Sequence, residues 1–396
     1  MNRRILALLI AFIMLFGLMT GCASGKQEAA APETAQTESP AAEEAAAEPD
    51  QTAESPAEEE VPAEPETVSF TDSLGRTVEL PADITRIAPS GAVATMILAA
   101  IAPECMVTIN AAPSESQIAF LPANLAALPE TGQMYGSKAN LNLETLLAAD
   151  PQVVIDLGDK KGDMTEDLDA LQEQIGIPVI FIEADLPHMA AAFRTLGGLL
   201  SGKSDRGEEL AALVDRTTAM AEENAAKITD DMRVRAMYTT GEDGLGTNAA
   251  GSMQAQVLDM VGVENAVVVE DVSNKGGGNI ISLEQLYNFD PDVILFADGS
   301  IYDTVADDSA WSQLTAISTG KYYEVPGSPY SWLSGPPSMN MILGVWWLGN
   351  LIYPEIYDYD METMTQELYK TLWGYELSSE EVTALLGNST LKAAAQ

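Results

Sequence analysis

The sequence predicts an α/β protein made of two Rossmann-like lobes with parallel-rich sheets, joined by one long α-helix. A segment that occurs twice supports this: residues 142–155 read NLETLLAADPQVVI and residues 282–295 read SLEQLYNFDPDVIL. Between the copies, residues 204–228 show the apolar stripe of one long amphipathic helix. Solenoid repeats recur at roughly 20–50 residues, so an offset of 140 residues indicates two equivalent lobes with a ligand cleft between them.

Each copy of the repeat describes a short helix, a break and a buried strand. Asn142 and Ser282 are good N-caps, and Ser282 with Gln285 fits a capping box. Asp-Pro at 150–151 and at 290–291 ends each helix, because the residue before proline is disfavoured in the α region. The apolar run after each proline suits a central parallel strand. A chance recurrence of a common helix–strand junction is the alternative interpretation.

The first lobe is expected over residues 68–202, in β-α-β order after a hairpin. The hairpin pattern alternates over 68–80 and turns at a glycine. Buried parallel strands read as short apolar runs, and helices show the 3.6-residue period. The predicted strands are 86–88, 107–109, 153–157 and 178–182, and the predicted helices are 92–101, 164–175 and 187–200.

The interlobe spine helix is expected within residues 203–229, and the second lobe over 230–396. The buried stripe of the spine consists of Leu210, Val214, Thr217, Ala221 and Ile228. A helix packed on one lobe alone is the alternative. In the second lobe the predicted strands are 234–238, 293–297 and 322–325, and the predicted helices are 253–261, 338–352 and 362–373, with Trp346 and Trp347 in the core.

Residues 1–22 are predicted to be a signal peptide of the lipoprotein type. Arg3 and Arg4 precede an apolar run that is shorter than the ~20 residues of a spanning helix. The run ends in MTGC at 19–22, which resembles a bacterial lipoprotein box, with methionine where leucine is usual. We therefore expect lipidation at Cys22 and a location on the extracytoplasmic face of the cell membrane. An ordinary secretory signal followed by a chance cysteine is the alternative.

Residues 23–67 are predicted to be a disordered acidic linker. They consist largely of Ala, Glu, Pro, Thr and Ser, which cannot bury enough apolar surface to offset chain entropy. The linker carries a net charge of −12 and residues 68–396 carry −31. Such an acidic chain is a poor partner for nucleic acid, whose phosphates require a basic face. With Cys22 lipidated, Cys105 is the only remaining thiol, and we expect it in the core.

Four motifs resemble the lipid-anchored substrate-binding proteins of bacterial ABC importers, in the class that carries iron–siderophore, haem and cobalamin complexes. They are the hairpin TDSLGRTVELP, the strand–Ser loop–helix at 87–97, the repeated LExL…DPxVI unit, and the tail PGSPYSWLSGPPSMNMILGVWWLGNLIYP. The resemblance covers residues 68–375. It implies a monomeric, non-enzymatic receptor without a cofactor, served by an ABC permease and its ATPase, with small hinge motion.

The resemblance leaves two cargoes open. The tail is similar to a subgroup associated with iron chelates, some of whose relatives bind molybdate or tungstate. An iron chelate is therefore the first expectation, and an oxyanion in the same receptor is the alternative. An exported lipid-anchored hydrolase is the alternative from a different class.

Ligands of open α/β sheets bind beyond the carboxyl ends of the strands. Loops that meet this rule and precede helices offer free N–H groups to an oxyanion or a chelate's carboxylates. Aromatic residues nearby could stack on a planar chelate or form an apolar wall. The candidate ligand-binding residues are Ser90, Gly91, Tyr135, Gly158, Asp159, Gly251, Ser252, Met253, Asp298, Gly299, Tyr330, Trp332, Pro337 and Ser338.

These assignments have structural alternatives. Glycine is the default turn residue, so each glycine alone is weak evidence. Trp332 could equally cover a core beneath the helix at 339–352. Tyr135 and Lys275 lie in glycine-flanked loops and could reach the cleft or face solvent.

His188, the single histidine, is predicted to lie on the surface. A bare transition-metal site usually needs several His or Cys ligands, so a naked zinc or manganese ion is disfavoured as cargo. A Ser–His–acid hydrolase would have to use this histidine, and the sequence contains no G-x-S-x-G elbow, P-loop or HExxH motif.

Members of the resembled family often carry one acidic residue on each lobe that pairs with arginines of the permease. The second-lobe glutamate of that pattern falls on Gln256 here, and Asp259 one turn later could replace it. In the first lobe Glu115 or Glu130 could serve. The resemblance therefore implies Glu115, Glu130 and Asp259 as permease-docking residues.

Overall fold

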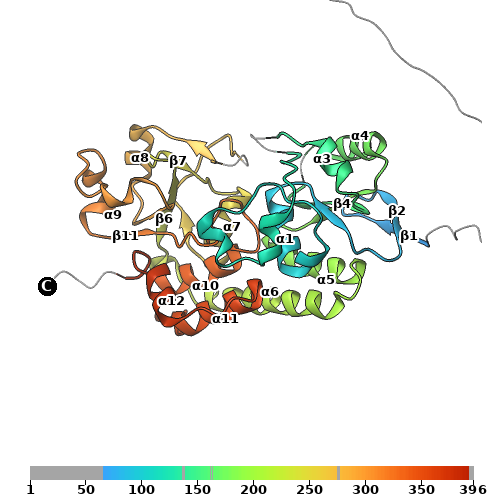
Figure 1. Cartoon of the computed structure of the whole chain (residues 1–396). Coiled ribbons are helices and arrows are strands. Elements are labelled where there is room, and N and C mark those ends of the chain that lie inside the picture. The colour runs from blue at the N-terminus through green and yellow to red at the C-terminus, as the bar shows by residue number, and fades with distance from the viewer. Residues whose placement is uncertain (1–65, 136–138, 161, 163, 274–276, 392–396) are drawn as a thin grey trace, which may run out of the picture. The chain divides into compact units, whose positions relative to one another are not determined.

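Two sheets with parallel strands at their centres, one in each lobe, organise the folded part of the chain (Figure 1). The computed structural model describes residues 66–135, 139–160, 162, 164–273 and 277–391. The predicted signal peptide, all but the last two residues of the predicted linker, Cys22 and Lys275 lie outside the described residues. The α/β class and the two-lobe arrangement that the sequence predicts are confirmed.

The first lobe contains a three-stranded parallel sheet in the order β3-β4-β5. The opening hairpin, predicted over 68–80, pairs β1 with β2 in antiparallel register. The strands are β1 (Thr67–Thr71), β2 (Thr77–Pro81), β3 (Ile87–Pro89), β4 (Val153–Gly158) and β5 (Val179–Glu183). The helices are α1 (Ala92–Ile101), α2 (Glu115–Ile118), α3 (Leu143–Ala148), α4 (Met164–Ile175) and α5 (Met189–Leu199).

The prediction of a strand over 107–109 is wrong. The segment makes single parallel bridges instead, from Met106 to Ile87 and from Ile109 to Glu130. Its backbone N–H groups bind two different segments. Val107 N–H donates to Ile87 O, and Ile109 N–H donates to Pro129 O, both at 3.0 Å. The chain leaves the edge of β3 too soon to extend the sheet.

The second lobe contains a sheet in the order β11-β10-β6-β7-β9, with β8 paired to β6. The strands are β6 (Arg235–Thr240), β7 (Gly246–Thr247), β8 (Glu264–Asn265), β9 (Asn279–Ile280), β10 (Val293–Phe296) and β11 (Tyr322–Glu324). The helices are α7 (Gln256–Met260), α8 (Leu283–Phe289), α9 (Thr315–Ser318), α10 (Met341–Ile352), α11 (Met361–Trp373) and α12 (Ser379–Leu385).

The two copies of the repeat have the same local structure. The Asn142 side chain accepts from Thr145 N–H, and Ser282 forms the predicted capping box with Gln285. The two strands that follow, β4 and β10, each lie between two parallel neighbours. The equivalence of the copies therefore extends beyond the matched residues to the central strand of each sheet.

An arginine from the neighbouring strand segment fixes the Asp-Pro break in each copy. Asp150 and Asp290 have φ values of 51° and 34°, and they are the two described non-glycine residues with positive φ. The Arg86 guanidinium donates to Asp150 O at 2.8 Å, and that of Arg235 donates to Asp290 O at 3.3 Å. Aspartate tolerates the left-handed region, and the charge-assisted bonds hold it there.

The spine helix α6 (Ser204–Ala225) packs against α1 and α5 of the first lobe and against α7 and α10 of the second. The predicted stripe residues are all buried. The helix ends three residues earlier than predicted, in a turn where Ile228 N–H donates to Ala225 O at 3.1 Å. Trp346 and Trp347 lie in the core, as predicted. None of the described helices has the length and apolarity required to cross a membrane.

The crossing of α5 and α6 depends on two glycines. A Cβ at Gly207 would lie 2.6 Å from Phe193 O and 2.8 Å from Gly197 Cα, both inside van der Waals contact. We expect Gly207→Ala to lower the free energy of unfolding by about 1–3 kcal/mol, because the helices must move apart. Urea unfolding measures this. Gly198→Ala, which meets no atom within 4 Å, is the control, and an equal effect of both variants would contradict the close-packing explanation.

Candidate ligand-binding site

A buried pair of polar side chains lies at the carboxyl end of the first sheet. Ser90 follows β3 and its hydroxyl donates to Oδ1 of Asp156, in the middle of β4. Ser90 is 4 % exposed and Asp156 is 5 % exposed. A carboxylate this deeply buried is stable as an anion only when donors surround it. The sequence prediction included Ser90 but missed Asp156.

Tyr135 lies close to this pair. Burial raises the pKa of its hydroxyl, and the nearby charges of Asp156 and Asp167 raise it further. The adjacent Met134 N–H donates to Ser90 O at 2.8 Å. The structure thus brings Tyr135 and Ser90 into one corner, where the charges of Asp156 and Asp167 raise the pKa of Tyr135 and the charge of Arg76 lowers it.

The predicted glycines of the first lobe lie at the same edge. Gly91 precedes α1, and a Cβ there would approach Gln133 Cβ to 3.1 Å. Gly158 ends β4 with φ 144°, and a Cβ there would lie 3.8 Å from Val93 at the start of α1. Asp159 is the next residue and is partly exposed. All five predicted first-lobe residues therefore lie near the carboxyl ends of β3 and β4.

In the second lobe, the predicted Gly251–Met253 segment is more enclosed than expected. Gly251 is exposed, with φ 84°, but Ser252 is 1 % exposed and its hydroxyl donates to Ala249 O at 2.8 Å. Met253 is 8 % exposed and begins a 3-10 turn (Met253–Ala255) that leads into α7. The Ser252 hydroxyl therefore has a structural partner already.

Asp298 and Gly299 are exposed and follow β10 after one residue, Ala297. The charge of Asp298 reaches Tyr238 on the neighbouring strand β6. The pKa of Tyr238 is raised to about 12, mainly by burial and also by the charge of Asp298. A hydrogen bond with Ser331 acts in the opposite direction and lowers this pKa. The sequence prediction did not include Tyr238, which connects the end of the second sheet to the 330–338 loop.

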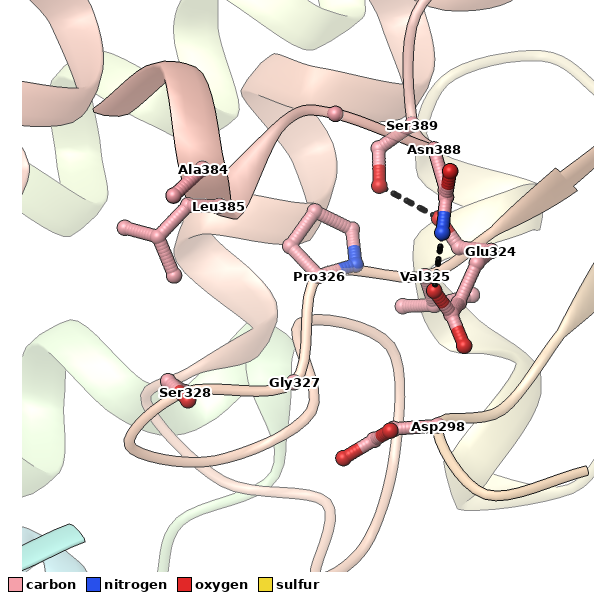
Figure 2. A pocket seen from close by; sticks show the side chains of 11 residues that line it. Asp298, Glu324, Val325, Pro326, Gly327, Ser328, Ala384, Leu385, Asn388 and Ser389 are labelled. Atoms are coloured by element: carbon pink, nitrogen blue, oxygen red, sulfur yellow. Dashed lines mark hydrogen bonds between the residues drawn. The ribbon is translucent and has the colours of Figure 1, made fainter. Parts of the chain in front are cut away.

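A pocket of about 370 Å³ opens beyond the carboxyl ends of β10 and β11 (Figure 2). Asp298 lies next to the Pro326-Gly327-Ser328 backbone, since a Cβ at Gly327 would lie 3.1 Å from Asp298 Cβ. Glu324 is also in the lining and accepts from Asn388 Nδ2 at 2.9 Å. The remaining lining residues are Val325, Ala384, Leu385, Gly387 and Ser389. The pocket lies where open α/β sheets bind ligands.

The predicted aromatic loop is divided between the surface and the core. Tyr330 and Pro337 are partly exposed, whereas Trp332 and Ser338 have no exposed surface. Burial raises the pKa of Tyr330 to about 12. Trp332 packs against Tyr369, with ring centroids 6.4 Å apart. Tyr330 thus keeps some exposed surface and Trp332 keeps none, which favours the core alternative for Trp332.

Glu115, Glu130 and Asp259 are all exposed, as a docking role requires. Gln256, which occupies the place of the expected glutamate, instead binds residues of the first lobe through both ends of its amide.

His188 is half-exposed, and its Nδ1 is paired with Asp185. Within the described residues, no three His, Cys, Asp or Glu side chains come together in a way that could hold a metal ion. Cys105 is buried, as expected, and burial raises the pKa of its thiol.

Comparisons with known proteins agree with this architecture. The profile of the family described as "Periplasmic binding protein" matches residues 104–329. No curated protein matches the chain. A solved ABC transporter solute binding protein from Sulfurospirillum deleyianum is 27% identical, with a TM-score of 0.74 over 81% of this chain and 99% of its own.

Two further solved structures share the fold at lower identity. A periplasmic solute binding protein from Veillonella parvula is 23% identical, with a TM-score of 0.68 over 82% of this chain and 98% of its own. The Haemophilus influenzae molybdate periplasmic binding protein MolA, solved with molybdate, is 20% identical, with a TM-score of 0.65 over 78% of this chain and 99% of its own.

Proposed function

Because the chain belongs to the periplasmic binding protein family, we propose that it captures an iron chelate of the siderophore, haem or cobalamin type and delivers it to an ABC permease and its ATPase. The observation that carries the proposal is the gathering of candidate residues at the carboxyl ends of the strands in both lobes. Solute-binding proteins of this family are transport components without catalytic activity, which leaves the hydrolase alternative without support.

The proposal includes a lipid anchor. The MTGC box at 19–22 and the acidic linker at 23–67 favour a monomer tethered through Cys22 on the extracytoplasmic face of the membrane. As a coil, that linker gives a root-mean-square reach of roughly 40 Å. This reach lets the folded part approach a permease while remaining attached to the surface.

An oxyanion is the second candidate cargo, since the relative MolA was solved with molybdate. The carboxylates at the strand ends disfavour an oxyanion. Asp156 is a buried carboxylate beside Ser90, and Asp298 and Glu324 line the pocket of the second lobe. Carboxylates that line a site repel an anion. The same charges disfavour an anionic chelate, so within the proposed class they favour a neutral or cationic metal complex, to which Tyr330 offers a partly exposed aromatic ring.

Titration of the purified chain tests the cargo. Ferric siderophores, haem, cobalamin and molybdate are added while tryptophan fluorescence is recorded. Saturable quenching by a chelate supports the proposal, whereas saturation by molybdate alone would favour the oxyanion. Silence across the panel would remove support for both cargoes. Mass spectrometry of the ligand that co-purifies from the native host then identifies it.

A further inference from the structure

The Gln256 amide joins the second lobe to the first. Gln256 is the first residue of α7, and its Nε2 donates to Asp185 Oδ2 at 3.0 Å. Its Oε1 accepts from the backbone N–H of Leu186 at 3.2 Å. Both ends of one side chain are therefore satisfied by a single turn of the other lobe.

The turn that Gln256 contacts is firmly held in the first lobe. Asp185 follows β5 and precedes the 3-10 turn Leu186–His188, whose Leu186 side chain is 1 % exposed. The Asp185 side chain is 16 % exposed, and its second oxygen pairs with His188 Nδ1. Because the Asp185 carboxylate is partly desolvated, its bond with the amide is stronger than one in open solvent.

The contact also fixes a predicted ligand loop. Ala255 N–H donates to Ser252 O at 3.0 Å, so a single 3-10 turn separates Ser252 from Gln256. A shift of Gln256 would carry the Gly251–Met253 segment with it. On the other side, Asp185 lies two residues beyond the end of β5, the immediate neighbour of β4.

We propose that Gln256 is a positioning residue that fixes the two halves of the ligand site relative to each other. The inference rests on the proposed function for the identity of that site. Glutamine suits the role because its amide donates and accepts at once. Glutamate cannot donate to Asp185 and would place a second negative charge beside it. Alanine would leave Asp185 Oδ2 and the Leu186 N–H without these partners.

The decisive experiment is a donor swap in the ligand-free full chain. In Gln256→Glu the bond to Asp185 is lost and two carboxylates face each other, whereas the Leu186 N–H keeps an acceptor. Adding Asp185→Asn restores a pair of bonds with the donor reversed, because asparagine donates to the new carboxylate and Leu186 N–H still has an acceptor. Asp185→Asn alone still offers an acceptor to Gln256 but loses the charge that pairs with His188. This single variant shows how much of any change in the swap comes from the His188 contact. Gln174→Glu, at an exposed position of α4, is the charge-matched control.

Two measurements follow the swap. Hydrogen exchange of a peptide containing Leu186 should be faster by roughly 5–30-fold in Gln256→Glu and Gln256→Ala. Pulsed electron resonance between spin labels at Glu144→Cys and Glu284→Cys, the matched exposed positions of the repeat, should show a broader interlobe distance distribution. Cys22→Ser leaves Cys105, which is buried, as the one native cysteine of the sequence. The swap should restore both readouts, and Gln174→Glu should change neither.

Two outcomes would overturn the proposal: a distance distribution in Gln256→Glu that matches the unmodified chain, or a swap that fails to restore it. Hydrogen exchange and the interlobe distance are both measured without ligand. They therefore test the positioning role independently of the proposed cargo. Silence in the ligand titration together with a rescued swap would count against the proposed cargoes and leave the positioning role of Gln256 intact. Once a chelate is found, its affinity should fall in Gln256→Glu and recover in the swap, and an unchanged affinity would contradict the positioning role.

Discussion

Replacing Trp332 with alanine should lower the free energy of unfolding by about 3–5 kcal/mol, the range for a large aromatic side chain removed from a core. Trp332 has no exposed surface and packs beside Tyr369. Its backbone is equally enclosed, because a Cβ at Gly344 of α10 would lie 2.1 Å from Trp332 O. The surroundings therefore cannot collapse far into the space that the indole leaves.

Urea unfolding followed by circular dichroism measures the loss. Tyr287→Ala is the matched control, since Tyr287 is an aromatic residue that is 42 % exposed and should cost far less. A Trp332→Ala variant whose free energy of unfolding is unchanged but whose chelate affinity is lower would contradict this prediction. That result would place the indole in contact with ligand and imply that the loop opens.

The sequence predicts local features of the repeat well because their causes are local. The capping box of Ser282 and Gln285 depends on four consecutive residues, and the Asp-Pro break depends on two. The arginines that hold the breaks could not be predicted in this way. Arg86 and Arg235 lie 64 and 55 residues from the carbonyl groups they bind, and only the sheet register brings them there.

In the candidate site, too, some residues could be predicted from local sequence and others could not. Glycines and Ser90 after strands are predictable, because the ends of parallel strands share an edge. Asp156 is a single acid inside the apolar run of β4, a signal that could have been used. Tyr238 carries no such signal, since an aromatic residue in a strand is usual. Tyr330 and Trp332 are two residues apart in an irregular loop, so no periodicity separates the partly exposed ring from the buried one.

Arg206 joins helix ends from both lobes to the spine. From the first turn of α6, its Nε and Nη2 donate to Ala100 O near the end of α1, at 3.0 and 2.9 Å. Nη2 also donates to Thr371 O in the last turn of α11, at 2.6 Å. The carbonyl groups at a helix C-terminus lack intrahelical donors and carry partial negative charge. One cation therefore stabilises two helix ends.

We expect Arg206→Ala to lower the free energy of unfolding by about 2–4 kcal/mol, because several charge-assisted bonds are lost and the carbonyl groups remain partly buried. Arg206→Lys should recover little, since a point charge cannot reproduce the planar fork that reaches two helices. Arg194→Ala is the control: it removes a comparable set of bonds, to Glu208 and Asp215, on an exposed face where solvent screens them. Equal losses for Arg206→Ala and Arg194→Ala in urea unfolding would mean that the number of bonds matters, and that their place between the two lobes does not.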